Sequence, residues 1–175
     1  IYFEQQLLLP KDTLHIVRTL FLWRATAYQR LGIFNHGDQP VSLTLSLVFT
    51  NDFADIFEVR GIRRMRRGTL WTQMGRQTVV LNYTGLDDRE RRSALRFDPA
   101  PNFVGGIASY LLELRPRQRQ SIFVAINCDN APEVSTVPFF RGMIAASREQ
   151  KAATRKSTTV ETANTLFNQV LCRSA

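Results

Sequence analysis

The feature that most constrains the fold of this 175-residue sequence is an alternation of apolar and polar side chains over residues 41–49, interrupted only by Val48. Residues 41, 43, 45, 47 and 49 are apolar, and residues 42, 44 and 46 are serine or threonine. Because successive side chains of a β-strand point to opposite faces, this period of two predicts a strand with one buried face. Residues 35–40 contain Asn, Gly, Asp and Pro, which favour a turn. We therefore predict a β-hairpin formed by residues 25–34 and 41–49.

Further strands are predicted where branched and aromatic residues lie between turn signals, at residues 14–23, 52–60, 78–83, 94–97, 107–114 and 121–128. Short strands without intervening helical periods predict a mainly β fold, an antiparallel β-sandwich. After Pro138 the apolar residues recur at helical spacing and predict two linker helices, the second of which opens with a capping box from Thr158 to Glu161. The predicted organisation is a sandwich domain at residues 1–137 and a helical linker at residues 138–175.

Composition limits the classes of partner. The formal charge is +8, and because only three of the 23 basic residues are lysines, 20 are arginines. Arginine forms bidentate pairs with carboxylates and phosphates, which suits internal ion pairs, protein interfaces or polyanions. No apolar run is long enough for a membrane helix, and Cys128 and Cys172 lack the spacing of metal ligands. We predict no membrane partner, metal or cofactor, and two buried thiols in a cytoplasmic protein.

The densest charges lie in residues 52–67, which contain the string DFADIFEVRG and an arginine-rich run. On an extended strand Asp52 and Glu58 would lie about 20 Å apart at ~3.3 Å per residue, whereas the two carboxyl groups of a glycosidase lie about 5–10 Å apart. We therefore expect ion pairs rather than catalysis, with Asp55 held by an arginine or by backbone amides. The predicted ion-pair set is Asp52, Asp55, Glu58, Arg60, Arg63, Arg66 and Arg67.

The sequence contains no familiar catalytic motif. His15 and His36 are far apart, no serine lies in a GxSxG elbow, and the glycines lack a phosphate-binding motif. The basic runs at residues 63–67 and 89–96, with aromatic residues nearby, leave nucleic-acid binding as a weaker alternative. Acidic residues interspersed among these arginines dilute the positive field that such binding needs.

Residues 52–61, followed by Arg66, Arg67 and Gly68, resemble the signature of the N-terminal domain of bacterial and archaeal glycogen debranching enzymes of the amylo-α-1,6-glucosidase type. Flanking segments agree in order, at residues 31–35, 83–87, 97–99, 112–116 and 164–174. The resemblance implies a supersandwich-like β-domain, which here lacks the family's first strands. It also implies that hydrolysis belongs to a following (α/α)6 barrel, which would begin where this chain ends.

The resemblance implies that this fragment carries no catalytic residue and is not itself an enzyme. One expectation is a non-catalytic domain that packs on the absent catalytic barrel of the same parent chain and supports it. The alternative is an α-glucan-binding module, in which Trp23, Trp71 and Tyr83 are the candidates for stacking on sugar rings.

Overall fold

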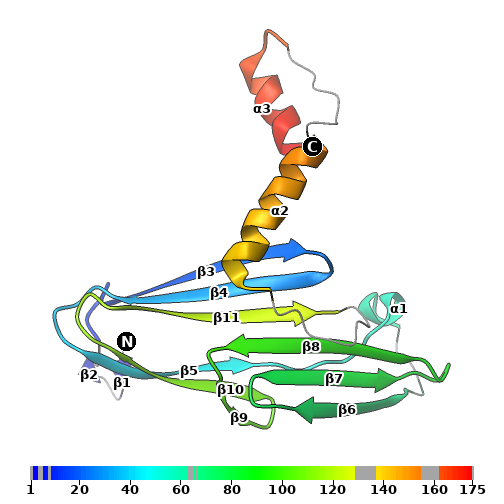
Figure 1. Ribbon diagram of the computed structural model, residues 1–175, viewed down its shortest axis with the longest axis horizontal. Helices are drawn as coiled ribbons and strands as arrows, with labels where there is room; N and C mark the ends of the chain where they lie inside the picture. Colours follow the sequence, from blue (N-terminus) through cyan, green and yellow to red (C-terminus); the bar gives the residue numbers. More distant parts are fainter. Residues whose placement is uncertain are drawn as a thin grey trace.

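The structure, a computed structural model, describes residues 2–3, 6–7, 9–62, 65, 67–128, 137–154 and 162–174. These residues form eleven strands and three helices (Figure 1). The strands are β1 (Tyr2–Phe3), β2 (Gln6–Leu7), β3 (Leu14–Trp23), β4 (Thr26–Asn35), β5 (Val41–Val48), β6 (Thr69–Met74), β7 (Thr78–Thr84), β8 (Glu90–Asp98), β9 (Asn102–Val104), β10 (Ile107–Leu114) and β11 (Arg119–Asn127). The helices are α1 (Ile56–Val59), α2 (Phe139–Thr154) and α3 (Thr165–Ser174).

Two antiparallel sheets pack face to face. The large sheet has six strands in the order β3-β4-β11-β8-β7-β6, and the small sheet has three strands in the order β5-β10-β9. Strands β1 and β2 form a separate two-stranded ribbon. The predicted mainly β, antiparallel sandwich followed by C-terminal helices is therefore confirmed.

The core lies between the two sheets, and its composition follows from strand periodicity. The alternating apolar residues of β5 pack against it, while Ser42, Thr44 and Ser46 are exposed, as the period of two predicted. The large sheet and β10 supply the fully buried side chains. The largest of these are Phe97, Ile33, Leu112, Leu114, Ile122 and Val79.

The large sheet also has a partly covered outer face, which points away from the small sheet. In β4, Leu31 and Ile33 belong to the core, so Tyr28 lies on the opposite face because side chains alternate along a strand. Tyr28 is nevertheless only 3% exposed, since the first turns of α2 cover it. Helix α2 rises from this face and passes beyond the edge strand β3 (Figure 1).

The predicted strand at residues 52–60 is wrong. Residues 51–55 are irregular and Ile56–Val59 form the short helix α1. The carboxylate of Asp55 accepts hydrogen bonds from the backbone N–H groups of Phe57 and Glu58, and the Glu58 carboxylate accepts one from the N–H of Asp55. This reciprocal capping box stabilises a helix start and prevails over the β propensity of the neighbouring branched and aromatic residues.

Other differences are smaller. Strands β1, β2, β6 and β9 were not predicted. The second linker helix begins at Thr165, where Asn164 accepts hydrogen bonds from two backbone N–H groups. The predicted capping box from Thr158 to Glu161 lies outside the described residues. Cys128 is exposed rather than buried, and the side chain of Cys172 is not among those described. Among the described helices, none is both long enough and apolar enough to cross a membrane.

Candidate functional site

The segment between β5 and β6 is attached to one end of the large sheet by two contacts with Tyr83. The ring of Phe53 stacks on the ring of Tyr83, with centroids 5.3 Å apart and planes 14° apart. The Tyr83 hydroxyl accepts a hydrogen bond from the backbone N–H of Gly68 at 3.1 Å. Both ends of the charged segment are therefore held against β7.

Glu58 connects the two ends of this segment. While one of its oxygens accepts from the backbone of Asp55, its Oε1 lies 3.0 Å from Nη2 of Arg67 and accepts a hydrogen bond from Nε of Arg67 at 3.1 Å. The Glu58 side chain is only 11% exposed. A carboxylate in that position needs partners, and Arg67 and the helix cap supply them.

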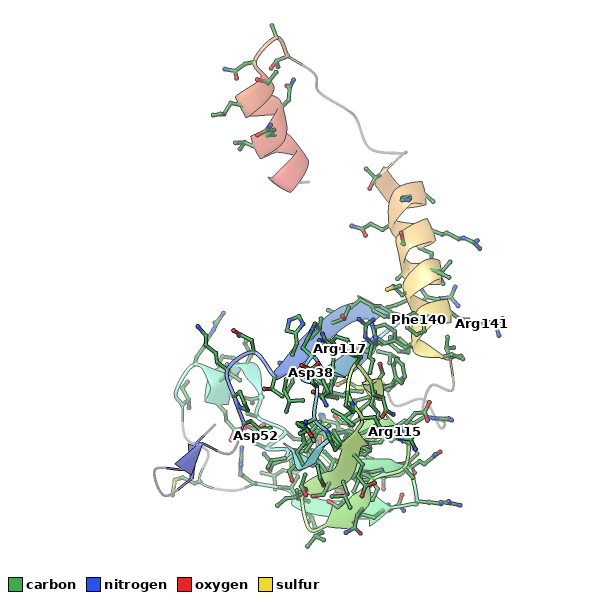
Figure 2. All side chains as sticks on the ribbon, turned by 90° about the vertical axis from the view of Figure 1, so that its left-hand side faces the viewer. Asp38, Asp52, Arg115, Arg117, Phe140 and Arg141 are labelled. Carbon is green, nitrogen blue, oxygen red and sulfur yellow. The ribbon has the colours of Figure 1, made fainter. Side chains whose placement is uncertain are left out.

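The remaining members of the predicted ion-pair set lie apart from this pair. Asp52 accepts a hydrogen bond from the backbone N–H of Ala54. Arg60 is the C-cap residue of α1, and its backbone N–H, not its side chain, makes the capping contact. Within the described part of the chain, neither side chain has an ion-pair partner. Arg63 and Arg66 lie outside the described residues. Figure 2 shows Asp52 well separated from Phe140 at the base of α2.

A hollow of about 430 Å³ lies between the start of the charged segment and the turn that joins β7 to β8. Phe53, Ala54 and Asp55 line one side, and the other is lined by Tyr83, Gly85, Leu86, Asp87 and Arg91. Asp87 forms a bidentate pair with Arg91 at 2.8 and 3.0 Å, and this hydrogen-bonded guanidinium lowers the pKa of the Asp87 carboxyl. Because its charged groups already bond to protein partners, this hollow offers few free polar groups to a ligand.

The three candidates for sugar stacking differ in what covers them. Tyr83 is 7% exposed and packed against Phe53, so its ring has no room for a sugar. The indole Nε1 of Trp23 donates a hydrogen bond to Glu149 at 2.8 Å, and the guanidinium of Arg24 lies 4.7 Å from the Trp23 ring centroid. Trp71 is 41% exposed on the edge strand β6.

Helix α2 is attached to the outer face through an aromatic cluster. The ring of Phe139 lies 5.1 Å from that of Phe21 and 5.5 Å from that of Phe123. Gly142 faces Phe21 and Tyr28, where a Cβ atom would have neighbours at 3.4 and 3.6 Å. Further along α2, Glu149 bonds to Trp23 and forms a 2.9 Å ion pair with Arg24. These contacts anchor α2 to the β3–β4 hairpin at two points.

A second hollow, of about 300 Å³, lies on the outer face beside the base of α2. Its lining is aromatic on the helix side and on β4 and β11, and polar on β8. Arg96 is half-buried and Asp98 is exposed, and no hydrogen bond or ion pair joins either side chain to another described residue. Figure 2 shows Phe140 where α2 meets the sheet. The lining side chains include Tyr28, Arg96, Asp98, Phe123, Phe139 and Phe140.

Sequence reasoning did not single out this hollow. One signal was available, because residues 94–97 were already predicted to be a strand. In β8 the polar Arg96 and Asp98 alternate with the core residues Leu95 and Phe97, which places both polar side chains on the face opposite the core. What the sequence could not show is that β11 and α2 bring aromatic side chains to the same place.

Residues 2–125 match the family model described as the N-terminal domain of (some) glycogen debranching enzymes. The chain belongs to this family. The match confirms the resemblance found in residues 52–68 and in the flanking segments between residues 31 and 116, whereas the segment at residues 164–174 lies outside the matched range.

Solved structures are similar to this family member at low identity. A structure titled Putative kojibiose phosphorylase from human microbiome shares 16% identity with a TM-score of 0.49, over 86% of this chain and 20% of its own. A structure titled Polysaccharide Lyase BACCELL_00875 shares 16% identity with a TM-score of 0.45, over 70% of this chain and 21% of its own. The chain thus spans about a fifth of the length of these proteins. No curated protein matches it.

Proposed function

We propose that this chain is a non-catalytic N-terminal domain of a glycogen debranching enzyme with α-1,6-glucosidase activity, and that it packs on and supports a catalytic (α/α)6 domain of the same parent. Family membership over residues 2–125 carries this proposal. In it, residues 1–137 form the sandwich domain and residues 138–175 form a helical linker toward the catalytic domain.

Exposed apolar side chains on two helical segments support a docking role. In α3, Leu166, Phe167 and Val170 are 72%, 50% and 57% exposed, although their spacing places them on one helix face. The segment that contains α1 likewise exposes a group of apolar side chains. These are Ile56, Phe57, Val59, Ile62 and Met65.

The energy available from covering these surfaces is substantial. Burying one large apolar side chain contributes about 1.5–3 kcal/mol, so several of them together can offset the roughly 4–15 kcal/mol cost of association. That cost is smaller when both domains belong to one chain, because the linker raises the effective concentration of each for the other.

The test separates the two parts of the parent. The present chain, carrying an affinity tag, is co-expressed with the following segment of the parent polypeptide as a second chain. We expect the two chains to co-purify and together to release glucose from a branched limit dextrin, whereas the second chain alone is unstable or inactive. Equal glucose release with and without the present chain would refute a supporting role.

Matched variants locate the contact. Phe167→Asp on α3 and Phe57→Asp on α1 each place a charge on a proposed contact surface, and we expect either to weaken co-purification. Leu111→Asp is the control, because Leu111 is 70% exposed on the small sheet, away from both helical segments. Co-purification that survives both test variants, or that fails equally in the control, would contradict the proposed contact surfaces.

A further inference from the structure

We propose that the hollow beside the base of α2 binds a short α-glucan segment, with Arg96 and Asp98 contacting sugar hydroxyls and aromatic rings contacting the sugar faces. The choice of an α-glucan rests on the proposed function above, while the existence of a ligand site rests on the geometry alone. This site contains none of the three aromatic residues that the sequence suggested for sugar stacking.

The register of the large sheet creates the hollow. Arg96 of β8 pairs with Ala125 of β11, which pairs with Tyr28 of β4, so the three side chains form one row across the outer face. Neighbouring strands lie about 4.8 Å apart, which separates the first and last Cα atoms of the row by roughly 10 Å. Only the methyl group of Ala125 stands between the long side chains of Arg96 and Tyr28.

The adjacent row and the helix form the walls. Asp98 pairs with Phe123, which pairs with Arg30, so an aromatic ring stands beside the gap left by Ala125. On the helix side Phe139 and Phe140 stand over the sheet, with ring centroids 5.5 and 5.9 Å from that of Phe123. Phe140 is 49% exposed and leaves part of its ring free.

The polar wall indicates a neutral ligand rich in hydroxyl groups. The Arg96 guanidinium offers up to five N–H donors and the Asp98 carboxylate offers acceptors, and neither has a hydrogen-bond partner among the described residues. Water reaches the half-buried Arg96 guanidinium, and the hydroxyl oxygens of a ligand can take the place of that water as acceptors. Because the two charges are opposite and only two residues apart, about 7 Å along the strand, they suit hydroxyls better than a phosphate or a nucleic acid.

The size and the aromatic lining agree with a sugar. A hollow of about 300 Å³ is at the lower limit for small-molecule sites, which suits one or two sugar units of a longer chain. The C–H groups on the face of a hexose are apolar and pack on aromatic rings, while its hydroxyls point outward to donors and acceptors. Phe123 and Phe140 supply such rings next to Arg96 and Asp98, whereas Tyr28 is 3% exposed and its ring is stacked on that of Phe21.

The test measures binding of maltotriose and maltoheptaose to the 175-residue chain by titration calorimetry and by perturbation of amide NMR signals. Cellotriose, which has the same sugar units in β linkage, is the matched control ligand. We expect saturable binding of both maltooligosaccharides, with the largest perturbations on β8 and β11 next to Ala125, and at least about tenfold weaker binding of cellotriose.

Variants separate this site from other surfaces. Ala125→Leu fills the hollow without removing a polar group, and Arg96→Ala removes the donors, so each should weaken maltoheptaose binding by at least about tenfold. Arg76→Ala, at an exposed turn arginine, and Trp71→Ala, at an exposed aromatic residue of β6, are controls and should bind as the wild type does. If Ala125→Leu lowers the melting temperature, Arg96→Ala and Asp98→Asn test the same site with smaller changes.

Three results would overturn the proposal: no saturable maltooligosaccharide binding, equal binding of cellotriose, or unchanged binding in Arg96→Ala and Asp98→Asn. Loss of binding in Trp71→Ala alone would also overturn it, because the sugar would then occupy β6. These outcomes are independent of the proposed function, since association with the catalytic domain and glucose release are measured on the two-chain enzyme. Failure to bind glucan together with normal assembly would therefore refute the site alone.

Discussion

Asn35 is expected to be one of the most sensitive positions in the sandwich. Its side chain is fully buried at the end of β4, where the carbonyl oxygens of Gln39, Leu114 and Arg115 share the two N–H donors of Nδ2 at 2.8, 3.1 and 3.2 Å. Its Oδ1 accepts a hydrogen bond from the N–H of Gly37 at 2.9 Å. One amide thereby joins the β4–β5 turn to the β10–β11 turn.

The cost of Asn35→Ala follows from the groups that lose their partner. Each buried polar group left unsatisfied costs about 1–3 kcal/mol, but only the bond to Leu114 is fully buried, and water can reach the other partners. We therefore expect a loss of roughly 2–4 kcal/mol in the free energy of unfolding. For a chain of this size that corresponds to a fall of about 5–15 °C in melting temperature.

Urea unfolding followed by tryptophan fluorescence measures this effect. The midpoint should fall while the m-value stays constant, since the surface exposed on unfolding does not change. Asn35→Asp should be at least as destabilising at neutral pH, because a carboxylate cannot donate to the three carbonyl groups. Asn102→Ala, at an exposed residue of β9, is the matched control. A loss below about 0.5 kcal/mol, equal to that of a surface substitution, would refute the reasoning.

Three further predictions test single contacts. Asp55→Ala should cost about 1 kcal/mol in urea unfolding by removing the cap of α1, whereas Asp55→Asn should cost only a few tenths because asparagine also caps helices; equal losses would contradict the capping role. Burial and the Asp98 carboxylate raise the pKa of Tyr110, so the folded state resists ionisation. Wild-type stability should then fall by up to ~1.4 kcal/mol per pH unit above about pH 10, a slope that Tyr110→Phe should lack. Gly142→Ala should raise the melting temperature, since helix propensity improves by about 1 kcal/mol and the new Cβ meets Phe21 at 3.4 Å; a lower temperature would indicate that α2 tolerates no added atom.

Local patterns predicted most strands because each depends on its own residues. The period of two at residues 41–49 gave β5, and the turn signals at residues 35–40 gave the hairpin between β4 and β5. The same kind of argument failed at residues 52–60, where a capping box between Asp55 and Glu58 competes with β propensity over a distance of only three residues. It also missed β1, β2, β6 and β9.

The candidate sites were less predictable than the strands. Glu58 was among the predicted ion-pair residues, but its partner Arg67 is nine positions away and its second role at the helix cap required the structure. Tyr83 was considered for sugar stacking, yet it is buried under Phe53, which lies 30 positions earlier in the sequence. Contacts of this kind depend on which strands become neighbours, and no local pattern encodes that choice.

The sequence by itself determined the class of fold, the alternation of buried and exposed side chains and the family, since these depend on the order of residue types along the chain. The tertiary structure alone decided that Arg96, Ala125 and Tyr28 share one row and that α2 closes it with Phe139 and Phe140. The physical reason is that strand order and register are fixed by packing of the whole core. A hollow on the outer face is a consequence of that packing.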